Sequence, residues 1–117
     1  MDLFDERVVM FESAEDGEHL LVTCEPTGAG GLVVREVSEG PLTQWCFEES
    51  PHTIETFIDH EGLRMLLRLY DVDTSIQVAR MLSISFADYD CGHRVRSLLR
   101  ELHMPFDVVE RPIDRAA

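Results

Sequence analysis

A thiol, an imidazole and two carboxylates lie within six residues of one another in the second half of the chain. Cys91 and His93 are separated by one glycine, and Asp88 and Asp90 precede them. At a helix start a thiol has a lowered pKa and a nearby imidazole can accept its proton, so these residue types could perform nucleophilic catalysis. Catalytic groups usually converge from distant segments, and residues two apart at a helix start point in different directions. A small enzyme using Cys91 and His93 is therefore an alternative hypothesis.

The segment Gly28–Gly31 is rich in glycine, which lets backbone amides approach a phosphate. A nucleotide-binding loop needs a lysine followed by serine or threonine, or a glycine pattern that opens a helix. The sequence contains no lysine, and the next residues, 32–37, are typical of a strand. We interpret the glycines as a connection between strands and expect no cofactor.

Two aspartate pairs, Asp71 with Asp73 and Asp88 with Asp90, resemble the first ligands of a calcium loop. Neither pair continues to the glycine and glutamate that such a loop needs, and helix capping explains both. The five histidines lack the spacing that places two ligands on one helical face. We expect no metal site.

The three cysteines, Cys24, Cys46 and Cys91, are widely spaced and odd in number. Such a pattern fits neither a disulfide framework nor a zinc ribbon. We expect three reduced thiols, two of them in the core.

In the first half of the chain, β-forming runs alternate with turn residues. Asp16-Gly17 is a strong hairpin signal between the first two runs, and the spacing of about ten residues per run predicts an antiparallel meander. The expected strands are 7–12, 19–24, 32–37 and 42–47, with 53–58 as a fifth. Trp45 falls in the fourth, where we predict a core position, with an interface anchor as the alternative.

The second half changes to the helical period. A first helix follows Asp59, a suitable N-cap, and a second follows Asp73 or Thr74. The residues 82–86 of the second helix also alternate like a strand, but we favour helix. The apolar positions of these two helices are Leu63, Leu66, Leu67, Tyr70, Ile76, Ala79, Leu82 and Phe86.

A third helix is expected after Asp88 or Asp90, and Pro105 ends it. Its apolar positions are Val95, Leu98, Leu99 and Leu102. The residues 106–110 then read as a last short strand at a sheet edge. The order of the expected strands and helices predicts an α+β fold in one domain, 1–117. It consists of an N-terminal antiparallel β-meander of four to five strands, two to three helices and a short C-terminal strand.

The formal charge of −13 is divided unevenly along the chain. Residues 1–59 contain 14 acids against two arginines, a net charge of −12, whereas residues 60–117 contain nine acids against eight arginines, a net charge of −1. An acidic field repels nucleic acid and anionic membrane and accelerates association with basic partners, although acid can also serve only solubility. The arginines of the two clearest helices are expected to form salt bridges with the sheet half or a solvated face. We expect neither direct nucleic-acid binding nor membrane binding.

The start of the chain argues against export. No apolar run approaches the length needed to span a bilayer, and the first residues are acidic where a secretory signal would be basic. We expect a cytoplasmic protein.

The helix starts and apolar positions of 58–67, 85–102 and 104–110 form a recognisable pattern. In this pattern the second half resembles the immunity proteins of bacterial polymorphic-toxin and contact-dependent inhibition systems. It implies a non-enzymatic bacterial antitoxin that neutralises a cognate toxin, and many such toxins are basic nucleases. No catalytic residue is carried over.

We therefore hypothesise a protein-binding immunity protein that meets a basic toxin through the carboxylates of the β half. The acids that we expect to be most exposed there are Glu15, Asp16, Glu18, Glu36, Glu39, Glu48 and Glu49. Besides the small enzyme, a third hypothesis is an acidic decoy that mimics nucleic acid. The decoy requires carboxylates spaced like phosphates along one exposed face.

Overall fold

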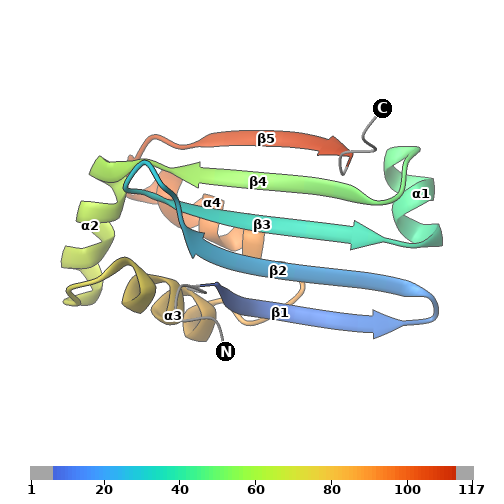
Figure 1. Cartoon of the computed structure of the whole chain (residues 1–117), viewed down its shortest axis with the longest axis horizontal. Coiled ribbons are helices and arrows are strands. Elements are labelled where there is room, and N and C mark those ends of the chain that lie inside the picture. The colour runs from blue at the N-terminus through green and yellow to red at the C-terminus, as the bar shows by residue number, and fades with distance from the viewer. Residues whose placement is uncertain (1–6, 113–117) are drawn as a thin grey trace.

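A computed structural model describes residues 7–112, and within them the chain forms one antiparallel sheet with four helices (Figure 1). The strands lie side by side in chain order, so each pairs with the next. Their bounds are β1, Val8–Glu15; β2, Glu18–Pro26; β3, Leu32–Glu39; β4, His52–Ile58; and β5, Asp107–Pro112. The α+β fold, the meander and the closing strand at the sheet edge are confirmed.

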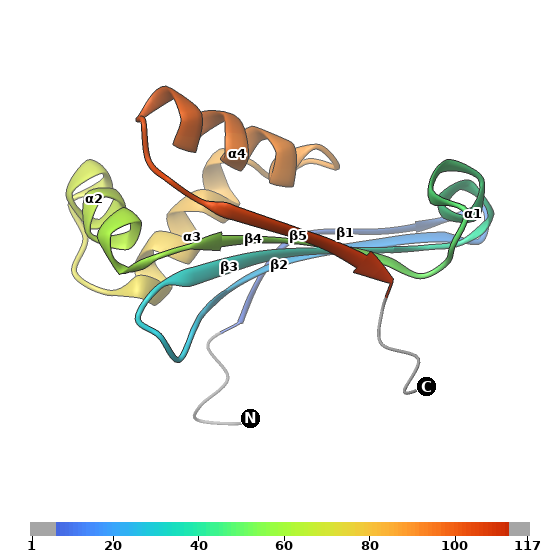
Figure 2. The ribbon, with the colours of Figure 1, turned by 90° about the horizontal axis from the view of Figure 1, so that it is seen from above.

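The helices occupy one face of the sheet and its two ends (Figure 2). Helix α4 lies over one face, α2 and α3 lie at one end, where α3 packs beside β1 and β2, and α1 lies at the opposite end. Their bounds are α1, Pro41–Phe47; α2, His60–Tyr70; α3, Ser75–Ser85; and α4, Cys91–Glu101. Within residues 7–112, no helix covers the other face of the sheet. Nor is any helix in this range long and apolar enough to cross a membrane.

Local sequence signals set most of the element boundaries. Asp16 and Gly17, with φ of 54° and 79°, form the hairpin turn, because such turns need two positive φ angles. The Asp59 side chain accepts a hydrogen bond of 2.9 Å from the amide of Gly62 and caps α2. Thr74 and Gln77 form a capping box at the start of α3, which continues to Ser85 as helix. Asp90 is the residue before α4, but its side chain makes no capping bond.

The core lies between the sheet and the helices that cover it. Val22, Cys24 and Val34 of the sheet pack against α2, α3 and α4, where Leu66, Leu82 and Leu99 have no exposed area. Burying each such leucine contributes about 1.5–3 kcal/mol to folding. The predicted apolar stripes of the helices therefore face the sheet.

The other face of the sheet carries an ion network in its middle. Arg35 Nε donates a bond of 2.8 Å to Glu55, and its Nη1 bonds Glu25. Burial opposes the charged form of Arg35, but the bonds to these two carboxylates outweigh it and raise the pKa of the guanidinium. Arg35 thus partly neutralises Glu25 and Glu55, two acids of the negative half of the chain.

The prediction of a strand over 42–47 is wrong, because these residues form α1. Gly40 has a φ of 139°, and Pro41 follows at the first helical position, where its missing N–H costs nothing. Glu48 ends the helix in the left-handed conformation. The apolar residues that suggested a strand lie on a single exposed helix.

Candidate functional site

Helix α1 is fastened to the sheet by a carboxylate from another segment. Glu18, at the start of β2, accepts hydrogen bonds from the amides of Leu42 and Thr43 at 2.8 and 3.0 Å and also bonds the Thr43 hydroxyl. The Thr43 hydroxyl and the two amides together hold the pKa of the Glu18 carboxyl below its usual value against the effect of burial. Because the helix lacks a capping side chain of its own, Glu18 takes that place.

The outer face of α1 is apolar and exposed. Leu42, Trp45 and Cys46 share this face by their helical spacing, and Leu42 and Trp45 are 60% and 80% exposed. We call these three residues the apolar face. The prediction of Trp45 as a core residue is wrong, because Thr43 is the residue that α1 buries.

Exposed acidic residues lie at the same end of the sheet as the apolar face. Glu15 and Asp16 lie at the β1–β2 turn, Glu39 ends β3, and Glu48 follows α1, and all four are exposed. These segments meet at the same end of the sheet (Figure 1), which we call the α1 end. An open hollow of about 570 Å³ separates the β1–β2 turn from Leu42. The α1 end thus combines an exposed tryptophan with four exposed carboxylates.

The other three acids in the predicted set are only partly exposed. Glu18 caps α1, Glu36 forms an ion pair of 2.6 Å with Arg96 of α4, and Glu49 bonds His52. The expectation that these three acids would be exposed is therefore wrong, and Glu36 also faces the helices, away from the α1 end. Partner binding by the whole set stays a prediction.

His52 joins three segments at the α1 end. Its Nδ1 lies 2.5 Å from Glu49, in the connection after α1, and its Nε2 lies 2.9 Å from Glu110 of β5. Its ring stacks on Phe47, the last residue of α1, with 3.9 Å between the ring centroids. Burial opposes the charged imidazole, but the two carboxylates outweigh it and raise the pKa of His52.

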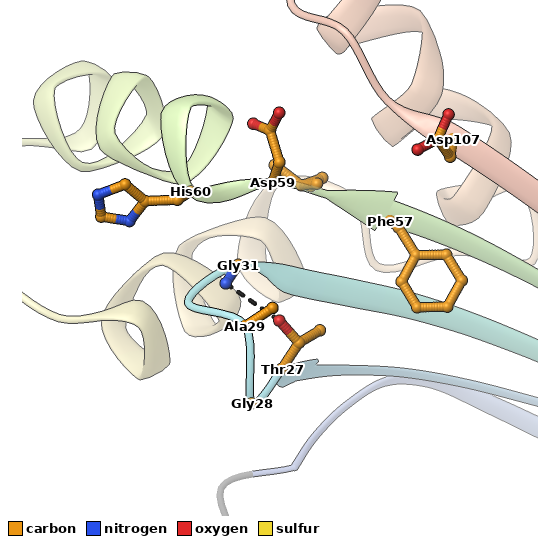
Figure 3. Close-up of a pocket in the computed structure, with 9 residues that line it drawn as sticks. Thr27, Gly28, Ala29, Gly31, Phe57, Asp59, His60 and Asp107 are labelled. Atoms are coloured by element: carbon orange, nitrogen blue, oxygen red, sulfur yellow. Dashed lines mark hydrogen bonds between the residues drawn. The ribbon is translucent and has the colours of Figure 1, made fainter.

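A second hollow, of about 390 Å³, lies at the opposite end of the sheet (Figure 3). Thr27 in the β2–β3 connection accepts a bond of 3.0 Å from the amide of Gly31, which explains the glycine-rich segment as a strand connection. The carboxylates of Asp59 and Asp107 and the ring of His60 point in different directions (Figure 3). They do not converge on a common ligand position.

The Cys91 and His93 side chains do not form a catalytic pair. Cys91 has no exposed area, whereas His93 is exposed on the far side of the same helix. Burial, with the nearby charges of Glu36 and Asp88, raises the pKa of the Cys91 thiol to about 11. A thiol of this kind is protonated at neutral pH and is a poor nucleophile.

The structure also locates the other cysteines, the candidate metal ligands and the helical arginines. All three thiols are free, Cys24 and Cys91 are buried as two of the three were predicted to be, and burial raises the pKa of Cys24 to about 12. Within residues 7–112, no group of three histidine, cysteine or acidic side chains could hold a metal ion. Of the helical arginines, Arg96 pairs with Glu36 of the sheet half, as expected, whereas Arg94 pairs with Asp88 of the helical half.

Comparison with models of protein families, with curated proteins and with solved structures gave no match for this chain. The α1 end is therefore identified as a candidate site from its geometry alone. Sequence reasoning found the acids of this end but missed the apolar face. The signal that could have found it is Gly40-Pro41, because proline is favoured at the first position of a helix and unusual inside a central strand.

Proposed function

We propose that the chain is a non-enzymatic protein-binding module of the immunity-protein type, which neutralises a basic toxin in the bacterial cytoplasm. The observation that carries the proposal is the exposure of Trp45, 80%, at the end of the sheet that also carries four exposed acids. Exposed apolar patches with a polar rim mark binding sites, and tryptophan is among the residues most enriched in binding hot spots.

The two components of the α1 end would act at different stages of binding. The free carboxylates of Glu15, Asp16, Glu39 and Glu48 would attract a basic protein and raise its association rate. The apolar face would then enter a pocket of the partner and slow dissociation. A basic nuclease toxin, whose surface must accept nucleic acid, has the charge that this end complements.

The geometry favours this proposal over the two alternatives. The buried, protonated Cys91 lacks the features of a catalytic thiol. The four exposed acids lie on three separate connections around a hydrophobic helix, which is not the continuous row that a nucleic-acid mimic requires.

Coexpression with the protein encoded by the adjacent upstream gene tests the proposal. We expect a complex that survives gel filtration and relief of any toxicity of that protein. The triple variant E15K/E39K/E48K should lower the association rate at low salt by more than about tenfold. Its matched control, E61K/D73K/E101K, makes the same charge change at exposed positions of the helical half and should have little effect. Absence of a complex and of any relief would refute the proposal.

A further inference from the structure

The imidazole of His52 contacts both α1 and the segments that flank it. Its side chain is 8% exposed and lies between Glu49, in the connection that follows α1, and Glu110 of β5. Phe47, the last residue of α1, stacks on the same ring with an angle of 11° between the planes. One side chain thus links α1, its following connection and the edge strand.

Among the described side chains, the charged groups that bond His52 are both acidic. Glu49 Oε2 lies 2.5 Å from Nδ1 and Glu110 Oε2 lies 2.9 Å from Nε2. From α1 the neighbour is the uncharged Phe47, and from β3 the residue in register is Ser38. The described surroundings therefore favour the imidazolium.

We propose that protonated His52 is a positioning residue that holds α1, and with it the apolar face, against the end of the sheet, and that loss of its proton releases this hold. The imidazolium donates one N–H to each carboxylate. A neutral imidazole has one N–H only, so its other nitrogen must face a carboxylate with no hydrogen between them. One of the two links then opens, either to the connection after α1 or to β5.

The direction of the pH dependence follows from the same contacts. The pKa of His52 is raised in the folded chain from its usual value of 6.5, since the two carboxylates outweigh the effect of burial. A group of this kind stabilises the folded arrangement fully below its unfolded pKa and loses this effect as the pH rises through the folded pKa. The hold of His52 on α1 should be complete at pH 6.5 and weaken as the pH rises through the raised pKa, which increases the local motion of the helix.

The consequence for binding rests on the proposed function, because a mobile α1 would present Trp45 less well to a partner. The motion itself does not depend on any partner. It can be measured on the free protein, so a failure of the proton-dependent hold is distinguishable from a failure of the proposed function.

Trp45 is the single tryptophan of the chain and reports on α1 directly. Its time-resolved fluorescence anisotropy, measured across a pH series, is compared with the NMR titration of the His52 ring proton. We expect the fast local motion of Trp45 to increase over the pH interval in which His52 loses its proton. In E110Q, which keeps the hydrogen-bonding shape but removes one charge, both midpoints should fall by about one pH unit.

Two further variants distinguish the effect of titrating His52 from the effect of titrating another histidine. H52Q should show no pH step in this interval, whereas H19Q, which removes an exposed histidine paired with Glu12 at 3.1 Å, should keep the step. Far-UV circular dichroism checks that each variant is folded, and if H52Q does not fold, E49Q and E110Q provide the test. Constant Trp45 anisotropy through the His52 titration, or an unchanged midpoint in E49Q and E110Q, would overturn the proposal.

Discussion

Arg96 Nη1 lies 2.6 Å from the carboxylate of Glu36, and this ion pair ties α4 to the middle of β3. The two side chains are only 13% and 16% exposed, and the same guanidinium nitrogen donates to the Thr56 hydroxyl at 3.1 Å. The Glu36 carboxylate packs so closely on Gly92 that any side chain there would collide with it. The helix and the sheet are therefore fitted to one another around a single carboxylate.

Replacing Arg96 by alanine should destabilise the fold, because it leaves Glu36 partly buried without its cation. We expect a loss of about 2–3 kcal/mol in the free energy of unfolding, as for other charged hydrogen bonds. Urea denaturation at pH 7 measures it. The control is Arg94→Ala, which removes a half-exposed pair with Asp88 and should cost about 1 kcal/mol or less. Equal losses in the two variants would contradict this account.

Gly31 should not tolerate alanine, whereas Gly28 in the same connection should. A Cβ at Gly31 would meet the backbone carbonyl of Ile58, which cannot move without disturbing β4. We expect Gly31→Ala to cost about 2–3 kcal/mol. A Cβ at Gly28 meets nothing, so Gly28→Ala should be neutral or stabilise by about 0.5 kcal/mol. Thermal unfolding of the two variants checks the difference, and a stable Gly31→Ala protein would show that the connection is looser than described.

Most of the fold could be predicted because its signals are local. The Asp16-Gly17 turn, the Asp59 cap and the Thr74 capping box each depend on residues a few positions apart. Helix periodicity likewise identified the buried face of each long helix, as Leu66 and Leu99 show.

Gly40-Pro41 marks the start of α1, but the way this helix is fixed to the sheet could not be predicted, because its main determinant is distant in sequence. The helix is seven residues long, too short for a helical period to be recognised, and its cap comes from Glu18, 24 residues before Leu42. Distance in sequence also explains why Glu36 was expected to be exposed, because its partner Arg96 lies 60 residues away. Charge counts show how many acids a segment has, but only the fold shows which of them are paired.

Glu18→Gln should loosen α1 without unfolding the sheet. The neutral amide is a weaker acceptor for the amides of Leu42 and Thr43, so both should exchange their hydrogens faster. The pKa of Glu18 is lowered in the folded chain, so the native contact should persist above the usual pKa and be lost as the pH falls through the lowered one. Hydrogen exchange measured by NMR, with Glu15→Gln as the control, tests this, and unchanged exchange at Leu42 and Thr43 would contradict it.

The three thiols should react in two classes. Cys46 is exposed, whereas burial raises the pKa of Cys91 to about 11 and that of Cys24 to about 12. With an aromatic disulfide reagent at pH 8 we expect one thiol per chain to react quickly and the other two only after denaturation. Cys46→Ser should abolish the fast phase, and its survival in that variant would mean that a buried thiol is accessible.

Trp45→Ala should separate stability from binding. The side chain is 80% exposed, so its removal should change the free energy of unfolding by no more than about 0.5 kcal/mol. If the apolar face enters a partner pocket, the same change should weaken the complex by at least about tenfold, mainly through faster dissociation. Ile84→Ala is the matched control, because Ile84 is 74% exposed on α3, away from α1, and should affect neither quantity.

The complex should also shield the apolar face from reagents. Cys46 lies beside Trp45 on α1, so its alkylation rate should fall when the partner binds and return to the free value when the partner is displaced. The measurement compares free and bound chain at one pH, which keeps the thiolate fraction the same in both. Undiminished alkylation of Cys46 in a complex that also tolerates Trp45→Ala would place the partner elsewhere on the molecule, because a side chain buried in an interface cannot remain open to reagent.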